Sequence, residues 1–166
     1  MLIMSEIIII AHNIRSAHNI GSIFRTCEGF GVSKIIISGY SPYPKLTNET
    51  RLPHLVDKLT NQIHKTALGA ENMVPFEYQE NVNFGLLKDR GYVIVGLEQD
   101  AHSIPINNYQ ISKKTALLLG EEVKGLTNDL RERCDVLIEI PMNGKKESFN
   151  VSVATGIALY ALTISV

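Results

Sequence analysis

The 166-residue sequence has no tryptophan and only two cysteines, Cys27 and Cys134. Two cysteines outside a CxxC arrangement are too few for a disulfide framework, so we expect a reducing, cytoplasmic setting. No apolar run approaches the roughly 18 residues of a membrane span. The apolar residues 1–10 lack the basic start and the small-residue cleavage site of a signal peptide. The sequence therefore favours neither a membrane protein nor a disulfide-rich secreted one.

Neither positive nor negative charge is in strong excess. Charged residues make up 20% of the chain, and the formal net charge is −1. Whole-domain basicity is the usual sign of a nucleic-acid-binding protein, so the overall charge gives that function no support, although a local basic patch is compatible with it. The hydrophobic content of 45% is ordinary for a globular protein. Without repeats, low-complexity tracts or linkers, residues 1–166 are expected to form one domain.

Several common motifs are absent. Neither GxGxxG nor GxxxxGK[ST] occurs, so a dinucleotide-dependent oxidoreductase or another nucleotide-using α/β enzyme has little support. The GxSxG elbow of serine hydrolases is absent too. The histidines show no zinc-binding spacing and none stands beside a cysteine pair, so no metal is predicted. They are His12, His18, His54, His64 and His102.

Short apolar runs alternate with helical segments. The runs are continuous rather than alternating with polar residues, which is typical of a parallel sheet covered on both faces. We predict an α/β fold with strands at residues 6–11, 34–38, 74–78, 92–97, 115–119 and 136–140. The predicted helices cover residues 22–30, about 57 to 69, 82–90, 127–134, and a C-terminal segment through Tyr160.

The C-terminal helix stands out because it is strongly apolar and carries small residues. Ser148 or Asn150 is predicted to cap its start. Small side chains at Ser152, Ala154 and Gly156 would let another element approach its backbone closely. Two of its faces are apolar enough to be buried, so we expect it in an interface or beneath other segments.

Three predicted strands are followed by unusual polar segments, at residues 12–25, 120–126 and 142–150. The carboxyl ends of parallel strands share one edge of a sheet, so these loops can converge on one ligand site. Taken singly, each has a simpler interpretation. Residues 120–122 suit a plain turn, Asn19 suits a helix cap, and Arg25 suits a surface cation.

Within these segments, three stretches resemble the ordered motifs of one family: NIGSIFRT at residues 19–26, LLLGEEVKGL at 117–126 and IEIPMNGKKESFNVSVA at 138–154. The family is SpoU/TrmH, a branch of the SPOUT superfamily of S-adenosylmethionine-dependent RNA ribose methyltransferases. The resemblance covers nearly the whole chain. It implies a parallel sheet flanked by helices, with a C-terminal deep trefoil knot, and a homodimer formed through the C-terminal helix.

The resemblance also implies catalytic residues. Arg25 matches the catalytic arginine, and Asn19 matches the asparagine that helps to organise it. Ser148 and Asn150 match the polar pair of the third motif. Glu122 matches the acidic residue of the second, and it also suits a structural anchor for the turn. A guanidinium is a poor base because its pKa exceeds about 12. Arg25 would therefore hold a phosphate and stabilise the developing alkoxide, or act as a base only with the help of a substrate phosphate.

S-adenosylmethionine is the implied cofactor, held in the knot by main-chain groups and an apolar slot. The matching residues are Leu97, Gly120, Ile140, Met142, Ser148 and Phe149. Position 149 is commonly leucine in this family, so phenylalanine keeps the apolar character but puts that contact in question. Candidate RNA phosphate contacts are Arg15, His18, Lys45, Arg51 and Lys124, each of which also suits an ordinary surface charge.

We therefore predict an enzyme that methylates a ribose 2′-hydroxyl in RNA. The length is similar to that of compact family members that modify tRNA, so tRNA is the expected substrate and rRNA the alternative. A non-catalytic, knotted RNA-binding module is a further alternative. It has no chemical need for all five matched polar residues, which argues against it.

Overall fold

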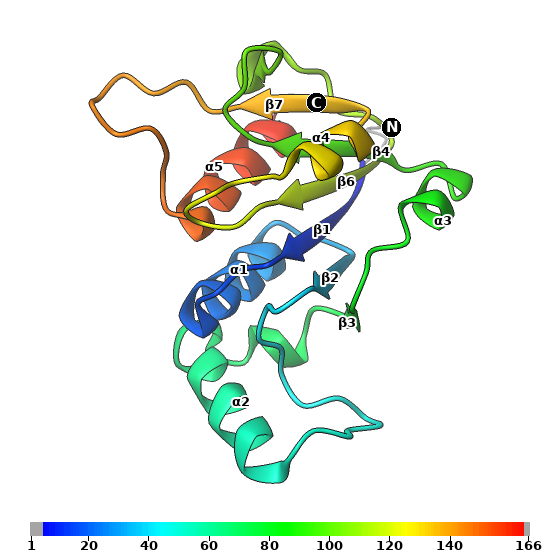
Figure 1. Ribbon diagram of the computed structural model, residues 1–166, viewed down its shortest axis with the longest axis vertical. Coiled ribbons are helices and arrows are strands. Elements are labelled where there is room, and N and C mark those ends of the chain that lie inside the picture. Colours follow the sequence, from blue (N-terminus) through cyan, green and yellow to red (C-terminus); the bar gives the residue numbers. More distant parts are fainter. Residues whose placement is uncertain (1–4, 165–166) are drawn as a thin grey trace.

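The computed structural model describes residues 5–164, in which seven parallel strands form one sheet in the order β3-β2-β1-β6-β4-β7-β5 (Figure 1). The interior strand β1 pairs with β2 on one side and with β6 on the other, so that Ile9 lies beside Ile35 and Leu117. The strands are β1 (Glu6–His12), β2 (Lys34–Ser38), β3 (Phe76–Gln79), β4 (Val93–Leu97), β5 (Ile104–Pro105), β6 (Lys114–Leu119) and β7 (Val136–Glu139). The predicted α/β class is confirmed.

Helices cover both faces of the sheet. Ile7 and Ile9 of β1 pack in one core with residues of α1 and α5, whereas Ile8 and Ile10 pack in a second core with residues of α3 and α4. Both sides of β1 are therefore buried, which explains its continuous apolar run. The helices are α1 (Ala17–Gly29), α2 (Pro53–Ala67), α3 (Phe84–Asp89), α4 (Asn128–Arg133) and α5 (Val151–Ile164), with 3-10 turns η1 (Ala70–Asn72) and η2 (Ile106–Asn108).

Two predicted helix starts and one strand need correction. Helix α1 begins at Ala17 rather than residue 22, because Ser16 caps it by accepting a hydrogen bond from the Asn19 amide (3.2 Å). Helix α2 begins at Pro53 rather than near residue 57, since proline suits the first helical position. Strand β5 was not predicted, because two residues are too short to show a pattern.

Helix α5 packs along α1 and begins where a long loop, residues 140–150, returns from β7 (Figure 1). Asn150 caps it, because its Oδ1 accepts hydrogen bonds from the amide and hydroxyl of Ser152 (2.9 and 2.7 Å). One face of α5 is buried in this chain. On another face Tyr160 is 59% exposed, so the second apolar face has no cover within residues 5–164. In that range no helix is long and apolar enough to cross a membrane.

Candidate active site

Glu122, in the loop after β6, accepts hydrogen bonds from three groups at the start of α1. Its carboxylate accepts hydrogen bonds from the backbone amides of Arg15 (3.2 Å) and Ser16 (3.4 Å) and from the side-chain amide of Asn19 (3.1 Å). A helix N-terminus favours a negative charge, because its amides point outward and its dipole is positive there. Burial alone would raise the pKa of Glu122, but these hydrogen bonds outweigh it and the pKa lies below its ordinary value.

Asn19 and Asn150 extend these contacts to the third motif. The Oδ1 atom of Asn19 accepts from the side-chain amide of Asn150 at 3.2 Å, and Asn150 in turn accepts from Ser152. Because Asn19 donates through its nitrogen to a carboxylate, its oxygen is the atom left to accept, so both amides have one defined orientation. Asn19, Glu122 and Asn150 are termed the motif cluster below. The cluster joins the three polar segments that the sequence predicted to converge.

The other two predicted catalytic residues lie outside this hydrogen-bonded cluster. Arg25 is exposed on α1, six positions after Asn19, and within residues 5–164 its guanidinium makes neither a hydrogen bond nor an ion pair. Its charge is thus available to a ligand. Ser148 is exposed in the loop before α5 and lines the neighbouring cavity.

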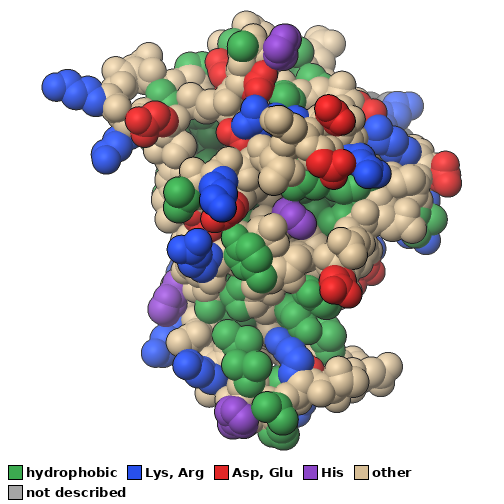
Figure 2. Space-filling view, in the orientation of Figure 1, with side chains coloured by type: hydrophobic (Ala, Val, Ile, Leu, Met, Phe, Trp, Pro, Cys, Tyr) green, Lys and Arg blue, Asp and Glu red, His purple; other side chains and the backbone are tan. Residues whose placement is uncertain are grey.

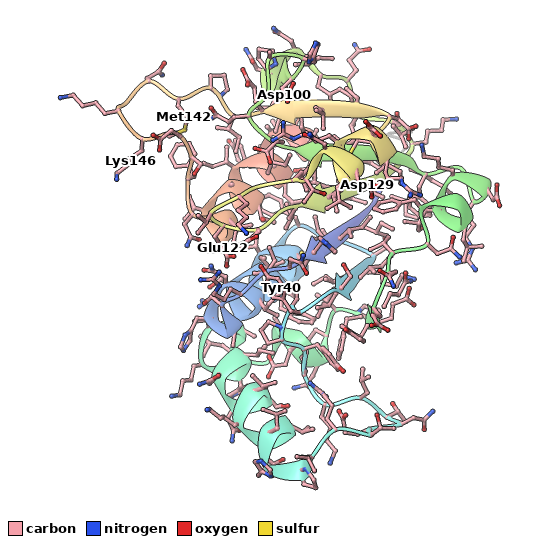
Figure 3. The ribbon with its side chains drawn as sticks, in the orientation of Figure 1. Tyr40, Asp100, Glu122, Asp129, Met142 and Lys146 are labelled. Carbon is pink, nitrogen blue, oxygen red and sulfur yellow. The ribbon has the colours of Figure 1, made fainter. Side chains whose placement is uncertain are left out.

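A cavity of about 270 Å³ lies at the carboxyl ends of β4, β6 and β7. Five of the six predicted cofactor residues line it, and Met142 does not. Met142 lies in the loop that projects from the body of the molecule, as does Lys146 (Figure 3). Lys124, predicted to contact RNA, lines the cavity too. The lining residues are Leu97, Glu98, Gln99, Leu119, Gly120, Glu121, Glu122, Val123, Lys124, Gly125, Glu139, Ile140, Glu147, Ser148, Phe149, Val151 and Ala154.

Close backbone approaches shape the loop at residues 120–126. A Cβ atom on Gly120 would lie 2.7 Å from the backbone of Gly125, so only glycine lets the loop fold back on itself. Gly125 has a φ of +65° and its Cα faces the Glu98 carboxylate, which accepts a hydrogen bond from the amide of Leu126. Gln99 donates to the Ile140 carbonyl at 3.0 Å.

Glu98 and Gln99 therefore hold the two loops of the cavity, residues 120–126 and 140–150, through hydrogen bonds. Sequence reasoning missed both residues. Their place directly after β4, at the same edge as the three polar segments, is the signal that could have found them. They also belong to a charged lining with five glutamates and one lysine. Such a lining suits a ligand that carries positive charge. In the described part of the chain, no His, Cys, Asp or Glu side chains form a group of three or more that could hold a metal ion.

The remaining RNA candidates lie around the start of α1 and the loop after β2. Arg15, His18 and Lys45 are exposed, and Arg15 approaches Glu121 at 3.5 Å. Arg51 differs from them, because its guanidinium is used inside its own loop. It bonds Glu49 at 2.6 Å and donates to two backbone carbonyls.

Comparison with known proteins gives a consistent result. The sequence model of the SpoU rRNA Methylase family matches residues 6–160. A 23S rRNA (guanosine-2′-O-)-methyltransferase of Nitrosomonas europaea is 32% identical over 156 residues, which are 93% of this chain and 54% of that protein. The chain spans about half the length of the curated bacterial relative.

Two solved structures share the fold. The TrmH/SpoU tRNA modifying enzyme of A. aeolicus is 30% identical, with a TM-score of 0.75, over 95% of this chain and 73% of that one. The AdoMet-bound rRNA methyltransferase of Sinorhizobium meliloti is 26% identical, with a TM-score of 0.76, over 94% of this chain and 55% of that one. The similarity thus extends across both the sheet and the motif segments.

Proposed function

The chain belongs to the SpoU methylase family and has its α/β fold, which is knotted, and on that premise we propose that it methylates a ribose 2′-hydroxyl of RNA with S-adenosylmethionine. The motif cluster carries this proposal. A hydrogen-bonded connection between Glu122, Asn19 and Asn150 spans more than a hundred residues of sequence, yet it holds the edges of a cavity together. Glu122 lines that cavity, and Asn150 lies between Phe149 and Val151, which also line it.

The cavity fits the cofactor in shape and charge. Leu97, Ile140 and Phe149 supply apolar walls for an adenine ring, and Gly120 leaves its backbone open to a ligand. The glutamates that line the cavity match the positive charges on the sulfonium and ammonium groups of S-adenosylmethionine. Lys124 can pair with the carboxylate of the same cofactor. When bound, S-adenosylmethionine supplies an electrophilic methyl group attached to a positively charged sulfur. Ser148, from the loop before α5, completes the lining of the proposed site, and Met142 of the same loop lies outside that lining.

The protein has to align the hydroxyl with that methyl group and exclude water. The hydroxyl oxygen gains the methyl group as the carbon–sulfur bond breaks, the bonding electrons stay on sulfur, and the hydroxyl proton passes to a phosphate oxygen or to water. Arg25 holds the phosphate beside the target ribose and stabilises the charge that develops on the oxygen. Glu122 is a structural anchor here, because three donors already occupy its carboxylate.

We assign tRNA as the substrate, with rRNA as the second candidate. The A. aeolicus tRNA modifying enzyme is 30% identical to this chain and the N. europaea rRNA enzyme is 32% identical, so the experiment below tests both classes of RNA. We also propose a homodimer through α5, because Val153, Tyr160 and Ile164 expose an apolar surface on that helix. A surface of this kind on a protein of this size commonly marks an interface.

The decisive experiment measures methyl incorporation from labelled S-adenosylmethionine into tRNA and, separately, rRNA from a strain that lacks this gene. Nuclease digestion then identifies the modified nucleoside. We expect a 2′-O-methylated nucleoside in the tRNA fraction. Label in rRNA alone would move the assignment to rRNA. Failure to bind the cofactor by calorimetry, together with no transfer, would favour the non-catalytic RNA-binding module.

A further inference from the structure

A second cavity, of about 390 Å³, lies between the loop after β2 and helices α1 and α2. The lower half of the face in Figure 2, where Figure 1 places α2 and this loop, carries mainly apolar and basic side chains. The cavity is distinct from the proposed cofactor site. Its lining residues are Arg15, Ala17, Gly39, Tyr40, Ser41, Pro42, Tyr43, Arg51, Leu59, Gln62 and Tyr78, and it is termed the Tyr40 pocket.

One wall of the pocket is a rigid stack of three side chains. The rings of Tyr43 and Tyr78 are stacked with centroids 4.2 Å apart, and the Arg51 guanidinium lies 3.6 Å from the Tyr43 centroid. These spacings put Arg51 and Tyr78 on opposite faces of Tyr43. Glu49 pairs with Arg51 at 2.6 Å, so the positive charge of this wall is balanced.

Tyr40 stands at the mouth of the pocket with an exposed ring, whose hydroxyl faces the Glu121 carboxylate, and with a fixed backbone. It is 54% exposed, while its amide donates to Asn13 Oδ1 at 3.1 Å. The preceding Gly39 has a φ of +64°, and a side chain there would overlap Asn13. An exposed aromatic ring on an immobilised backbone is prepared for stacking, since little conformational entropy is lost on binding.

The pocket shares a rim with the motif cluster. The Arg15 backbone bonds Glu122, and its side chain, 73% exposed, lies 3.5 Å from Glu121. Figure 3 shows Tyr40 and Glu122 at the same edge of the sheet. A nucleotide bound in the pocket would therefore be adjacent to a ribose held at the cluster.

We propose that the Tyr40 pocket binds an unpaired base of the substrate RNA, stacked on Tyr40, with Arg15 on an adjoining phosphate. This inference rests on the proposed function and adds to it a base-binding position beside the reacting ribose. Proteins commonly recognise single-stranded RNA by stacking bases on aromatic rings with arginine nearby. A pure phosphate site would not need three tyrosines. Gln62 lines the pocket and can both donate to and accept from a base edge.

The test compares two fluorescein-labelled single strands of equal length, an oligoadenylate and a strand of abasic residues with the same phosphates. Tyr40→Ala is expected to weaken oligoadenylate binding about 10-fold and leave abasic binding unchanged, because only the stacked base is lost. Tyr40→Phe keeps the ring and should bind like wild type. Arg15→Ala should weaken the binding of both strands.

Met73→Ala is the control, because Met73 is 69% exposed and lies outside the pocket. Circular dichroism checks folding, and Tyr40→Leu replaces Tyr40→Ala if the latter unfolds. If Tyr40→Ala lowered the affinity for both strands equally, or for neither strand, the pocket proposal would be overturned. Absence of methyl transfer by wild type would overturn the proposed function instead, and Tyr40-dependent preference for the base-bearing strand would still support the pocket.

Discussion

Arg25 and Glu122 illustrate two ways in which a charged residue serves a site. Glu122 is fully engaged, with two backbone amides and Asn19 on its carboxylate. Arg25 is exposed and makes no hydrogen bond or ion pair with other residues in the range 5–164. The first arrangement joins two loops, and the second leaves an exposed guanidinium that the proposed function assigns to the substrate phosphate. Different outcomes of substitution are therefore expected.

Arg25→Ala should lower the rate of methyl transfer by about 100-fold or more, because charge stabilisation on the reacting oxygen is lost. Cofactor affinity, measured by calorimetry, should stay within error of wild type, since Arg25 does not line the cofactor cavity. Arg133→Ala removes an exposed arginine on α4 and should change neither quantity. Parallel loss of transfer and cofactor binding in Arg25→Ala would argue against its catalytic role.

Glu122→Gln should destabilise the protein at neutral pH, with the effect disappearing in acid. The folded-state pKa of Glu122 is depressed, so its stabilising contribution is present above the unfolded-state value, about 4.3. It is lost as pH falls through the lower folded-state pKa. Urea unfolding at a series of pH values measures this difference between variant and wild type. A difference that stays constant down to pH ~3 would contradict the assignment.

At the scale of elements, the close approach of α1 to α2 depends on one glycine. A Cβ atom on Gly21 would overlap the Ile63 carbonyl oxygen and the Thr66 hydroxyl of α2. The two helices form an extensive contact, and α1 also carries Asn19 and Arg25. Displacing α1 from α2 would therefore disturb the motif cluster as well as the core.

Gly21→Ala is expected to lower the free energy of unfolding by roughly 1–3 kcal/mol, because the added methyl group overpacks the helix contact. Gly29→Ala is the matched control on the same helix, since its Cβ would meet nothing within 4 Å. It should be neutral or stabilising by up to about 1 kcal/mol, because alanine favours helix over glycine. Urea unfolding measures the free energy of unfolding of both variants. Equal changes in the two variants would show that the contact between α1 and α2 does not restrict the side chain at position 21.

The pattern of elements was readable because buried parallel strands are continuous apolar runs, as in β1, β2 and β6. The start of α1 was misplaced because its first turn is polar and includes the residues that bind Glu122. Polar residues in the first turn of a helix hide the apolar period by which helices are recognised. For the same reason, Ser16 was not identified as the cap.

At the scale of the whole molecule, α5 is incompletely covered. Val151, Leu159 and Leu162 are buried against the body, whereas Tyr160 and Ile164 are each 59% exposed. Tyr160→Glu would place a charge on the proposed dimer surface, where desolvation is costly. We expect sedimentation to show a dimer for wild type and a monomer for this variant. Met73→Glu, at an exposed apolar residue away from α5, should remain dimeric, and a monomeric wild type would refute the interface.

From the residues alone, the sheet class, the convergence of three polar loops and the family were all predictable, because apolar runs and motif order are local features of the chain. The tertiary structure was needed for the contacts between distant side chains. It places Glu122 on the amides of α1, Glu98 beneath the cavity loop and Tyr40 beside Arg15. These pairs come from separate strand ends, and sequence spacing carries no information on which of them meet. Their proximity follows from the order of strands in the sheet.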